Sequence, residues 1–390
     1  MIEFRAVHKR FPNGTTAVHD LTMDVPDGAI TVLVGTSGCG KTTTLRMVNR
    51  MVEPTSGTIR VAGKDVLAQD AALLRRSIGY VIQQSGLFPH RTVLDNVATV
   101  PLLLGWGRRK ARARAAELLQ IVGLAPEAAK RYPHQLSGGQ QQRVGVARAL
   151  AADPPVLLMD EPFGAVDPVV RTQLQDELLR LQKELAKTIV FVTHDIDEAV
   201  RLGDRIAVFR TGGELVQYAS PAQLLARPAD PFVADFLGAE RGLKLLSLIA
   251  LADVASGPVP EGGRWELVLG PGRTPVGWRD RDAPDGTALR PVRPLRDADS
   301  LLSALNESVS SPCGLVARVD AAGALTGVTS REEIHERAGA AHTTAAHTTA
   351  ARAPDPAAPT AIADARTDPY DSSDGGTAAG EPAAPRGGTP

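Results

Sequence analysis

Cysteine is almost absent from this sequence of 390 residues, which contains only Cys39 and Cys313. Two isolated cysteines supply neither a disulfide framework nor a CxxC metal site, so disulfide-rich secreted folds are excluded. The first residues, MIEFRAVHKRF, also lack the apolar core of a secretory signal. We therefore expect a cytoplasmic protein.

Neither sign of charge is in excess, because 43 Lys and Arg face 44 Asp and Glu and the formal net charge is −1. Nucleic acids and anionic membranes that bind through bulk electrostatics require a basic excess, so neither is expected as a direct partner. The sequence also lacks an uninterrupted run of about 18 apolar residues, which is the length needed to cross a bilayer. Any role at a membrane would depend on a partner protein.

Aliphatic and aromatic residues become scarce from about residue 338 to residue 390, where Ala, Thr, Pro, Gly and Asp dominate and AHTTA is repeated. Such a segment cannot bury enough apolar area to offset its chain entropy, so we expect a disordered tail. Its weak acidity allows two interpretations, an electrostatic sensor or a neutral low-complexity extension, and the composition favours the second. The rest of the chain is long enough for two folding units.

Five short apolar runs in the first 240 residues indicate an α/β fold. They carry consecutive rather than alternating apolar side chains, which is typical of strands buried on both faces of a parallel sheet. The runs are 29–35, 77–83, 155–160, 188–194 and 205–210. Helical patterns, such as 171–185, lie between them. From 88 to 153 the strand signal disappears, which predicts a helical subdomain inserted into the sheet domain.

A third block, from about 241 to 337, has a less regular pattern. Pro, Gly and Arg crowd its middle, and a helical pattern then follows at 297–308. Strand-like runs at 314–320 and 325–330 precede a closing helical pattern at 331–339. We expect a small α+β regulatory domain here.

The strongest chemical signal is GTSGCGKT at 35–42, which matches the phosphate-loop pattern GxxxxGK[ST] between a predicted strand and a predicted helix. The glycines let backbone N–H groups surround phosphate oxygens, and the following helix presents its positive end to the anion. Lys41 can reach the β- and γ-phosphates, and the Thr42 hydroxyl is placed to bind Mg²⁺. The context predicts a nucleoside triphosphate site.

Two acidic residues, Asp160 and Glu161, end the predicted strand at 155–160. Carboxylates at this edge of an α/β sheet face the crevice where ligands bind. Asp160 would hold the Mg²⁺ shell through water, and Glu161 would orient or activate the attacking water. By themselves the two acids would be read as a solvated strand end, but the phosphate loop favours the catalytic interpretation.

A second candidate anion site is LSGGQ at 136–140, directly before a helical pattern. Adjacent glycines at a helix start expose backbone donors, and Ser137 adds a hydroxyl. The structural alternative is that Ser137 simply caps the helix. One nucleotide does not need two such sites in a single chain.

The sequence contains GTSGCGKTT, LSGGQ and VLLMDEP in this order, and it thereby resembles the ATP-binding subunits of ABC transporters. The resemblance covers about 1–238. It implies a P-loop NTPase fold and a dimer that sandwiches two ATP molecules between the phosphate loop of one subunit and LSGGQ of the other. It also implies that Phe11 stacks on adenine, that Gln83 is the Q-loop glutamine, that Asp167 is the D-loop aspartate and that His194 is the switch histidine.

Simpler structural roles stay open for three of these residues. Phe11 could be a half-buried loop aromatic, and His194 could be a satisfied core histidine. Asp167 could cap the helix that follows it, and that role is compatible with the D-loop role.

Catalysis is assigned to Glu161, His194 and Lys41, and Mg²⁺ binding to Thr42, Gln83 and Asp160. The predicted ATP contacts are Phe11, Gly35, Thr36, Ser37, Gly38, Cys39, Gly40, Lys41, Thr42, Thr43, Gln83, Ser137, Gly138, Gly139, Gln140, Asp160 and Asp167.

Longer segments at 47–57, 78–106 and 226–238 resemble the ATPases that import osmoprotectants and quaternary amines such as glycine betaine, carnitine, choline or proline betaine. Segment 291–334 resembles a CBS module, which these ATPases often carry as a tandem pair, and the first copy, within 243–285, is degenerate. The resemblance further implies permease subunits, an extracytoplasmic substrate-binding protein and a peripheral location at the cytoplasmic face of the membrane.

Two rival functions remain. An importer of another small solute, such as an amino acid or a polyamine, would carry the same motifs. A soluble ABC ATPase that serves translation or DNA repair would usually have two cassettes or a long coiled coil, and this sequence has one LSGGQ and no heptad array.

Overall fold

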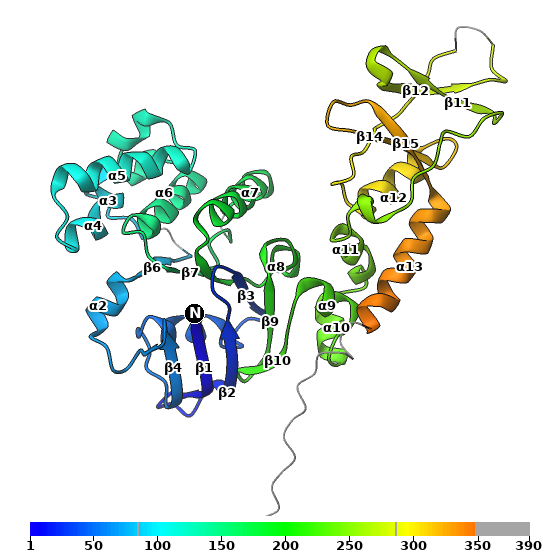
Figure 1. The fold of residues 1–390 in the computed structure, drawn as a ribbon. Coiled ribbons are helices and arrows are strands. Elements are labelled where there is room, and N and C mark those ends of the chain that lie inside the picture. Colours follow the sequence, from blue (N-terminus) through cyan, green and yellow to red (C-terminus); the bar gives the residue numbers. More distant parts are fainter. Residues whose placement is uncertain (84–85, 165, 285–286, 348–390) are drawn as a thin grey trace, which may run out of the picture. The chain divides into compact units, whose positions relative to one another are not determined.

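The structure is a computed structural model that describes residues 1–83, 86–164, 166–284 and 287–347 (Figure 1). Most of the predicted tail lies outside these residues. Its first part, 338–347, is instead the end of helix α13 (Arg331–His347). The prediction of disorder is wrong for that part, because the Ala-rich sequence continues a helix without having to bury apolar area.

The centre of the first domain is a set of parallel strands. They are β3 (Ile30–Gly35), β6 (Ile78–Val81), β7 (Val156–Asp160), β8 (Thr188–Val192) and β9 (Arg205–Arg210), paired in the order β9-β3-β8-β7-β6. All five predicted runs are confirmed. Every residue of β3, β7 and β8 is buried, as expected for strands covered on both faces.

Antiparallel strands extend this sheet to ten strands, so the α/β prediction is confirmed with a mixed sheet. They are β1 (Ile2–Arg10), β2 (Thr16–Val25), β4 (Ser56–Val61), β5 (Lys64–Asp65) and β10 (Glu214–Ala219). Strands β10 and β2 pair through Glu214 and His19 alone. The sheet therefore joins an antiparallel part to the parallel part at a narrow seam.

Helices pack on both faces of the parallel strands. They are α1 (Lys41–Val48), α2 (Ala71–Arg76), α7 (Pro168–Leu185), α8 (Ile196–Leu202), α9 (Pro221–Ala226) and α10 (Pro231–Leu237). Alternate residues of β3 enter two separate cores, because Val32 and Val34 face one core and Leu33 faces the other. Strand β3 ends at Gly35 and α1 begins at Lys41, so the loop 36–40 and the start of α1 lie at the carboxyl edge of the parallel strands.

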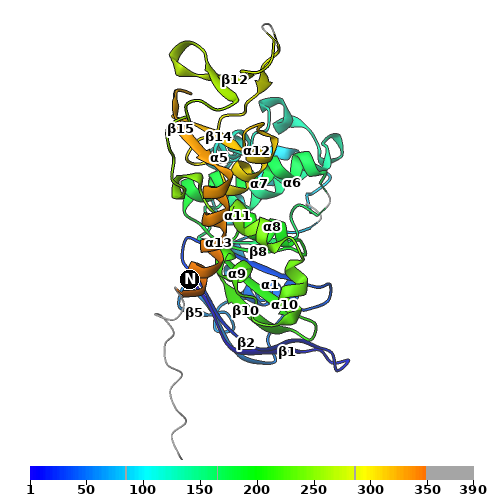
Figure 2. The same cartoon turned by 90° about the vertical axis from the view of Figure 1, so that its right-hand side faces the viewer.

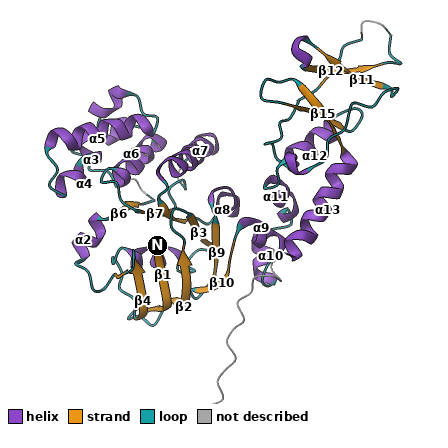
Figure 3. Ribbon diagram, in the orientation of Figure 1, coloured by secondary structure: helices purple, strands orange, loops and turns teal. Residues whose placement is uncertain are grey.

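The segment between β6 and β7 is helical, as Figure 3 shows. It contains α3 (Val93–Val97), α4 (Thr99–Leu103), α5 (Arg108–Ile121), the short 3-10 turns at Pro126–Lys130 and Pro133–Gln135, and α6 (Gly138–Leu150). Helices α6 and α7 contact each other on one face of the parallel strands, and both lie away from the antiparallel strands β1 and β2 (Figures 1 and 2). The arrangement brings the start of α6 near the start of α7.

The C-terminal block is a mixture of helices and short strands. It contains α11 (Arg241–Ser247), 3-10 turns at Leu251–Asp253 and Pro271–Arg273, β11 (Trp265–Leu269), β12 (Pro275–Asp280), β13 (Arg290–Pro291), α12 (Leu301–Ser310), β14 (Leu315–Val319), β15 (Leu325–Ser330) and α13. Leu295 forms an isolated parallel bridge with Arg318 of β14, so the second half has the order bridge, helix, strand, strand, helix. Within the described ranges, no helix is both long and apolar enough to cross a bilayer.

Candidate functional site

The phosphate loop connects β3 to α1 and is packed tightly against backbone on two sides. At Gly40, φ is 97°, and a Cβ would lie 1.9 Å from the carbonyl oxygen of Ala17 in β2. At Gly35, a Cβ would lie 2.2 Å from the carbonyl oxygen of Phe209 in β9. Only glycine fits these positions, so the sequence pattern is also a packing requirement.

Lys41 is buried, and the loop itself holds its ammonium group. Nζ donates hydrogen bonds to the carbonyl oxygens of Gly35, at 2.8 Å, and Thr36, at 3.0 Å. Nζ also donates to Sγ of Cys39 at 3.7 Å. Sulfur is a weak acceptor, so a phosphate oxygen can displace this third bond. Neighbouring Cys39 is also buried, and burial raises the pKa of its thiol, which therefore stays neutral near pH 7.

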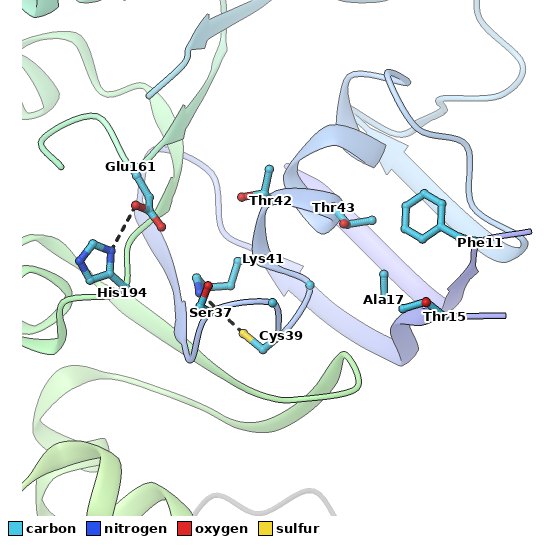
Figure 4. A pocket seen from close by; sticks show the side chains of 12 residues that line it. Phe11, Thr15, Ala17, Ser37, Cys39, Lys41, Thr42, Thr43, Glu161 and His194 are labelled. Carbon is cyan, nitrogen blue, oxygen red and sulfur yellow. Dashed lines mark hydrogen bonds and ion pairs between the residues drawn. The ribbon is translucent and has the colours of Figure 1, made fainter. Parts of the chain in front are cut away.

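A cavity of about 440 Å³ opens beside this loop (Figure 4). Its walls are formed by Phe11, Thr15, Ala17, Ser37, Gly38, Cys39, Gly40, Lys41, Thr42, Thr43, Glu161 and His194. Phe11 lies at one end and Glu161 with His194 at the other, with the phosphate loop between them. The cavity therefore joins an aromatic side chain to a carboxylate and an imidazole through a phosphate-binding loop.

Thr42 and Asp160 form the part of the site suited to a metal ion. Oγ1 of Thr42 donates to Oδ1 of Asp160 at 2.8 Å. Asp160 is buried, and burial raises the pKa of its carboxyl, whereas the bond from Thr42 and the charge of Arg46 lower it. One carboxylate and one hydroxyl are the hard oxygen ligands that Mg²⁺ takes when phosphate and water complete its shell. The donor set fits that ion.

A fuller metal cage is not present in the described part of the chain, where no group of three or more His, Cys, Asp or Glu side chains could hold a metal. This agrees with the chemistry of Mg²⁺, which is usually bound through one or two carboxylates and a phosphorylated substrate.

Glu161 and His194 come from neighbouring strand ends. Asp160 of β7 pairs with Val192 of β8, so the residues that follow both strands emerge at one edge of the sheet. Nδ1 of His194 lies 3.2 Å from Oε2 of Glu161, and 64% of the histidine side chain is exposed. The core alternative for His194 is therefore wrong. Glu161 also has φ 44°, a left-handed conformation that costs on the order of 1–3 kcal/mol outside glycine.

Gln83 lies beyond the strand that was expected to end with it. Strand β6 ends at Val81, and Gln83 is exposed in the following loop. Its Nε2 is nevertheless 3.3 Å from Oε2 of Glu161. The structure therefore brings Gln83, Glu161 and His194 together, although each follows a different strand.

Ser137 and Asp167 both cap helices. Oγ of Ser137 accepts from the N–H of Gln140 at 3.3 Å, and Gln140 returns a bond to the N–H of Ser137, which forms a capping box at the start of α6. Oδ1 of Asp167 accepts from the N–H of Val170 at 3.1 Å at the start of α7. The capping alternatives are correct for both residues.

The predicted residues thus separate into two groups. Phe11, the loop from Ser37 to Thr43, Glu161 and His194 line one cavity, and Asp160 and Gln83 bond to its walls. The other predicted contacts, all of them described in the structure, do not line it: Gly35, Thr36, Ser137, Gly138, Gly139, Gln140 and Asp167. Gly35 and Thr36 instead hold Lys41 through their carbonyl oxygens. Sequence reasoning missed Thr15, in the loop after Phe11, and Ala17, in strand β2, because neither has a distinctive pattern.

Comparison with known proteins gives a consistent result. Residues 18–164 match the family model described as ABC transporter. The chain is 53% identical over 241 residues to the glycine betaine/carnitine/choline transport ATP-binding protein OpuCA of Bacillus subtilis, and the match covers 62% of this chain and 63% of that protein. It is 56% identical over 239 residues to the osmoprotectant import ATP-binding protein OsmV of Salmonella typhimurium, covering 61% and 62%. The chain thus spans less than two thirds of these two relatives.

A third relative is matched over almost its whole length. The chain is 48% identical over 322 residues to the glycine betaine uptake system ATP-binding protein YehX of Escherichia coli, covering 80% of this chain and 96% of that protein. Among solved structures, the dimeric structure of a bacterial ABC transporter cassette is 36% identical, with a TM-score of 0.52, and covers 57% of this chain and 99% of that one. A dimeric cassette in a post-hydrolysis state with ADP and Pi is 34% identical, with the same TM-score of 0.52 and the same coverage.

Proposed function

Because the chain belongs to the family of ABC transporter ATP-binding proteins, we propose that it is the ATP-hydrolysing subunit of an importer for a quaternary-amine osmoprotectant. Glycine betaine, choline, carnitine and proline betaine are the proposed solutes. The observation that carries this proposal is the 48% identity over 96% of a protein named for glycine betaine uptake. The names of OpuCA and OsmV support the same class of solute.

The cavity supports ATP as the nucleotide. Its length places an aromatic ring, Phe11, at one end for stacking on the purine, and the loop amides and Lys41 in the middle for the phosphates. The γ-phosphate then lies near Glu161 and His194. Thr42 and Asp160, with Gln83 from the side, would hold Mg²⁺, which neutralises charge on the β- and γ-phosphates when it is bound.

Hydrolysis follows from the positions of these side chains. Glu161 accepts a hydrogen bond from the attacking water and takes its proton as the oxygen attacks phosphorus in line with the departing ADP. His194 donates to a γ-phosphate oxygen and so orients the group. The ammonium group of Lys41 exchanges its weak bond to Cys39 for a phosphate oxygen and stabilises the charge that develops on the phosphates.

A second copy of the chain would complete the site. Ser137 and Gly138 are exposed at the N-terminus of α6, a helix of 13 residues, and Asp167 is exposed at the start of α7. In the proposed dimer, ATP bridges Lys41 of one subunit and Ser137 of the other, and loss of that bridge on hydrolysis lets the dimer open. The dimeric cassettes among the solved structures support this arrangement.

Transport requires partners outside this chain. We propose permease subunits, to which the helical subdomain after Gln83, including Phe88 to Val93, passes the motion, and an extracytoplasmic binding protein that recognises the solute. The chain would then be peripheral at the cytoplasmic face of the membrane. The α+β block at 241–337 is proposed as a CBS-like regulatory domain with a degenerate first copy, because its second half has the strand and helix order given above.

Solute uptake tests the proposal and separates it from an amino-acid or polyamine importer and from a soluble ATPase. A deletion strain in high salt is supplied with labelled glycine betaine, choline or carnitine, and complemented with the wild-type gene or with Glu161→Gln. We expect uptake of at least one of these solutes with the wild type only. Equal uptake with and without the wild-type gene, for all three solutes, would contradict the proposed function.

A further inference from the structure

Glu198 is a buried carboxylate that the proposed mechanism does not use. It lies on α8 and is 6% exposed. Its Oε1 accepts a hydrogen bond of 3.0 Å from Nε2 of Gln175 on α7, which is 5% exposed. Folding therefore buries two polar side chains between two helices. Such burial is destabilising unless each side chain finds a hydrogen-bond partner.

The second partner of Glu198 is the residue that precedes the switch histidine. Buried Thr193 interacts electrostatically with the carboxylate of Glu198, and its hydroxyl accepts a bond of 3.0 Å from the N–H of Asp195. The backbone of Thr193 is itself fixed, because its N–H donates to the carbonyl oxygen of Leu33 in β3. On the other side of His194, Oδ1 of Asp195 accepts a bond of 3.4 Å from the N–H of Glu198. Glu198 therefore interacts with the residues on both sides of His194.

Helix α7 connects Glu198 to the face proposed for the second subunit. It begins at its cap, Asp167, and Val169 in its first turn is 70% exposed, so this end of the helix is open to a second subunit. Gln175 lies about two turns further along the same helix. A helix transmits displacement along its axis as a rigid body, so a contact at Asp167 reaches Gln175.

Two ion pairs also connect these helices. Arg171 of α7 pairs at 3.7 Å with Asp195, the cap of α8, and the two side chains are 31% and 35% exposed. Arg201 and Asp176 form an ion pair of 2.7 Å, with side chains that are 38% and 62% exposed. Exposed pairs of this kind contribute little, because water and salt screen them. Burial raises the pKa of the Glu198 carboxyl, and its interactions with Thr193 and Gln175 oppose that shift. Loss of one partner of the buried Glu198–Gln175 bond leaves the other unsatisfied, so this link is more sensitive to substitution than the surface pair.

We propose that Glu198 is a positioning residue that couples the start of α7 to His194. Through Gln175 and Thr193 it sets the histidine relative to Asp167, so that arrival of a second subunit at α7 places His194 against the γ-phosphate. The inference rests on the proposed function, because it requires ATP hydrolysis by a dimer. Glu198 acts through His194 and is therefore separable from nucleotide binding.

The test uses the full-length protein and three variants. Glu198→Ala removes the link, Glu198→Gln retains a hydrogen-bonding side chain of the same size, and Asp176→Asn is the matched control at the surface pair. ATP affinity is measured with trinitrophenyl-ATP, and kcat, KM and cooperativity by steady-state hydrolysis. We expect Glu198→Ala to lower kcat about 10- to 100-fold and to abolish cooperativity, with ATP affinity unchanged. Glu198→Gln and Asp176→Asn should behave as the wild type.

If Glu198→Ala does not fold, exchanging the side chains at 175 and 198 provides a second test. Gln175→Glu alone places two carboxylates against each other in a buried site and should lower kcat. Combining it with Glu198→Gln restores one carboxylate and one amide with their roles exchanged, and kcat should recover. Failure of the double variant to recover, while it binds ATP with normal affinity, would overturn the proposal.

The outcomes also separate this inference from the function on which it rests. An active, cooperative Glu198→Ala variant overturns the inference and leaves the proposed function intact. A loss of ATP affinity, melting temperature and kcat together in Glu198→Ala indicates a purely structural role and also overturns it. A wild-type protein that binds ATP and hydrolyses none contradicts the proposed function itself.

Discussion

Nδ1 of His194 lies 3.2 Å from Oε2 of Glu161, and the same oxygen lies 3.3 Å from Nε2 of Gln83. The carboxylate is therefore held from two sides by groups that follow two other strands. A general base needs a fixed direction as well as a suitable pKa, and these two contacts supply it. The left-handed backbone at Glu161 aims the side chain into the cavity at the same point.

The first prediction concerns that carboxylate. Glu161→Gln keeps the size of the side chain and its contact with Gln83 but cannot accept a proton, so ATP hydrolysis should fall by about 10²- to 10⁴-fold. ATP binding should persist, and size-exclusion chromatography with ATP should show a trapped dimer. Glu127→Gln, at an exposed position in a 3-10 turn, is the control. Normal turnover in Glu161→Gln would remove Glu161 from its assigned role.

The second prediction concerns the metal. Thr42→Val preserves the shape of the side chain and removes the hydroxyl that contacts Asp160. Loss of a supporting contact to a metal ligand weakens metal binding about 10- to 100-fold. The free Mg²⁺ concentration that supports half-maximal hydrolysis should therefore rise at least that much. Thr42→Ser retains the hydroxyl and should retain the wild-type Mg²⁺ dependence. An identical Mg²⁺ titration for Thr42→Val and the wild type would exclude Thr42 as a ligand.

The third prediction concerns the aromatic end of the cavity. Stacking of a base on an aromatic side chain contributes about 1–3 kcal/mol, so Phe11→Ala should weaken ATP binding by about tenfold or more. Phe11→Trp should bind as the wild type does. Tripolyphosphate has no base, so its affinity should be the same in all three proteins, as calorimetry would show. Equal ATP affinity for Phe11→Ala and the wild type would show that Phe11 is only a loop aromatic and does not stack on the base.

The fourth prediction separates the two roles of Ser137. Aspartate is a good helix cap, so Ser137→Asp should preserve the melting temperature, whereas Ser137→Ala should lose about 1 kcal/mol of stability. The added negative charge would repel the phosphates of a nucleotide held by the other subunit. In the Glu161→Gln background, Ser137→Asp should therefore bind ATP as a monomer and fail to form the ATP-dependent dimer. Dimer formation at the usual ATP concentration would show that Ser137 only caps α6.

The fifth prediction concerns pH. Burial raises the pKa of Glu198 in the folded protein, so its contribution to stability is fully present below the unfolded pKa of about 4.3 and is lost as pH rises through the folded pKa. Gln cannot ionise, so Glu198→Gln should gain melting temperature relative to the wild type as the pH rises from about 4.5 to 7.5. Calorimetric melts at both pH values check this. A difference independent of pH would mean that Glu198 is not perturbed by burial.

Much of the parallel sheet could be predicted because its strands are buried on both faces. The run 188–192 is apolar after Thr188 and has no exposed position, and only a central strand accommodates that pattern. The antiparallel strands were missed. In β1 the exposed and buried positions alternate irregularly, because register shifts interrupt its pairing with β2 at several points. Such interruptions erase the period of two on which a prediction depends.

The site was predicted motif by motif, but its internal contacts were not. The contact of Gln83 and His194 with Glu161 depends on the order of β6, β7 and β8 in the sheet, which is a property of the fold and not of any one segment. The buried bond between Gln175 and Glu198 was missed for the same reason. In the sequence both residues look like ordinary members of solvated helix faces.

Ser137 does not line the cavity that Lys41 lines. This separation has a genetic consequence for mixtures of two mutant alleles. In a dimer with shared sites, a copy that lacks Lys41 and a copy that lacks Ser137 meet in mixed pairs, where one site carries both lesions and the other carries neither. Two alleles that are each inactive alone would then complement one another in the same cell. A Glu161→Gln allele would behave in the opposite way and would be dominant, because it traps every wild-type copy with which it pairs.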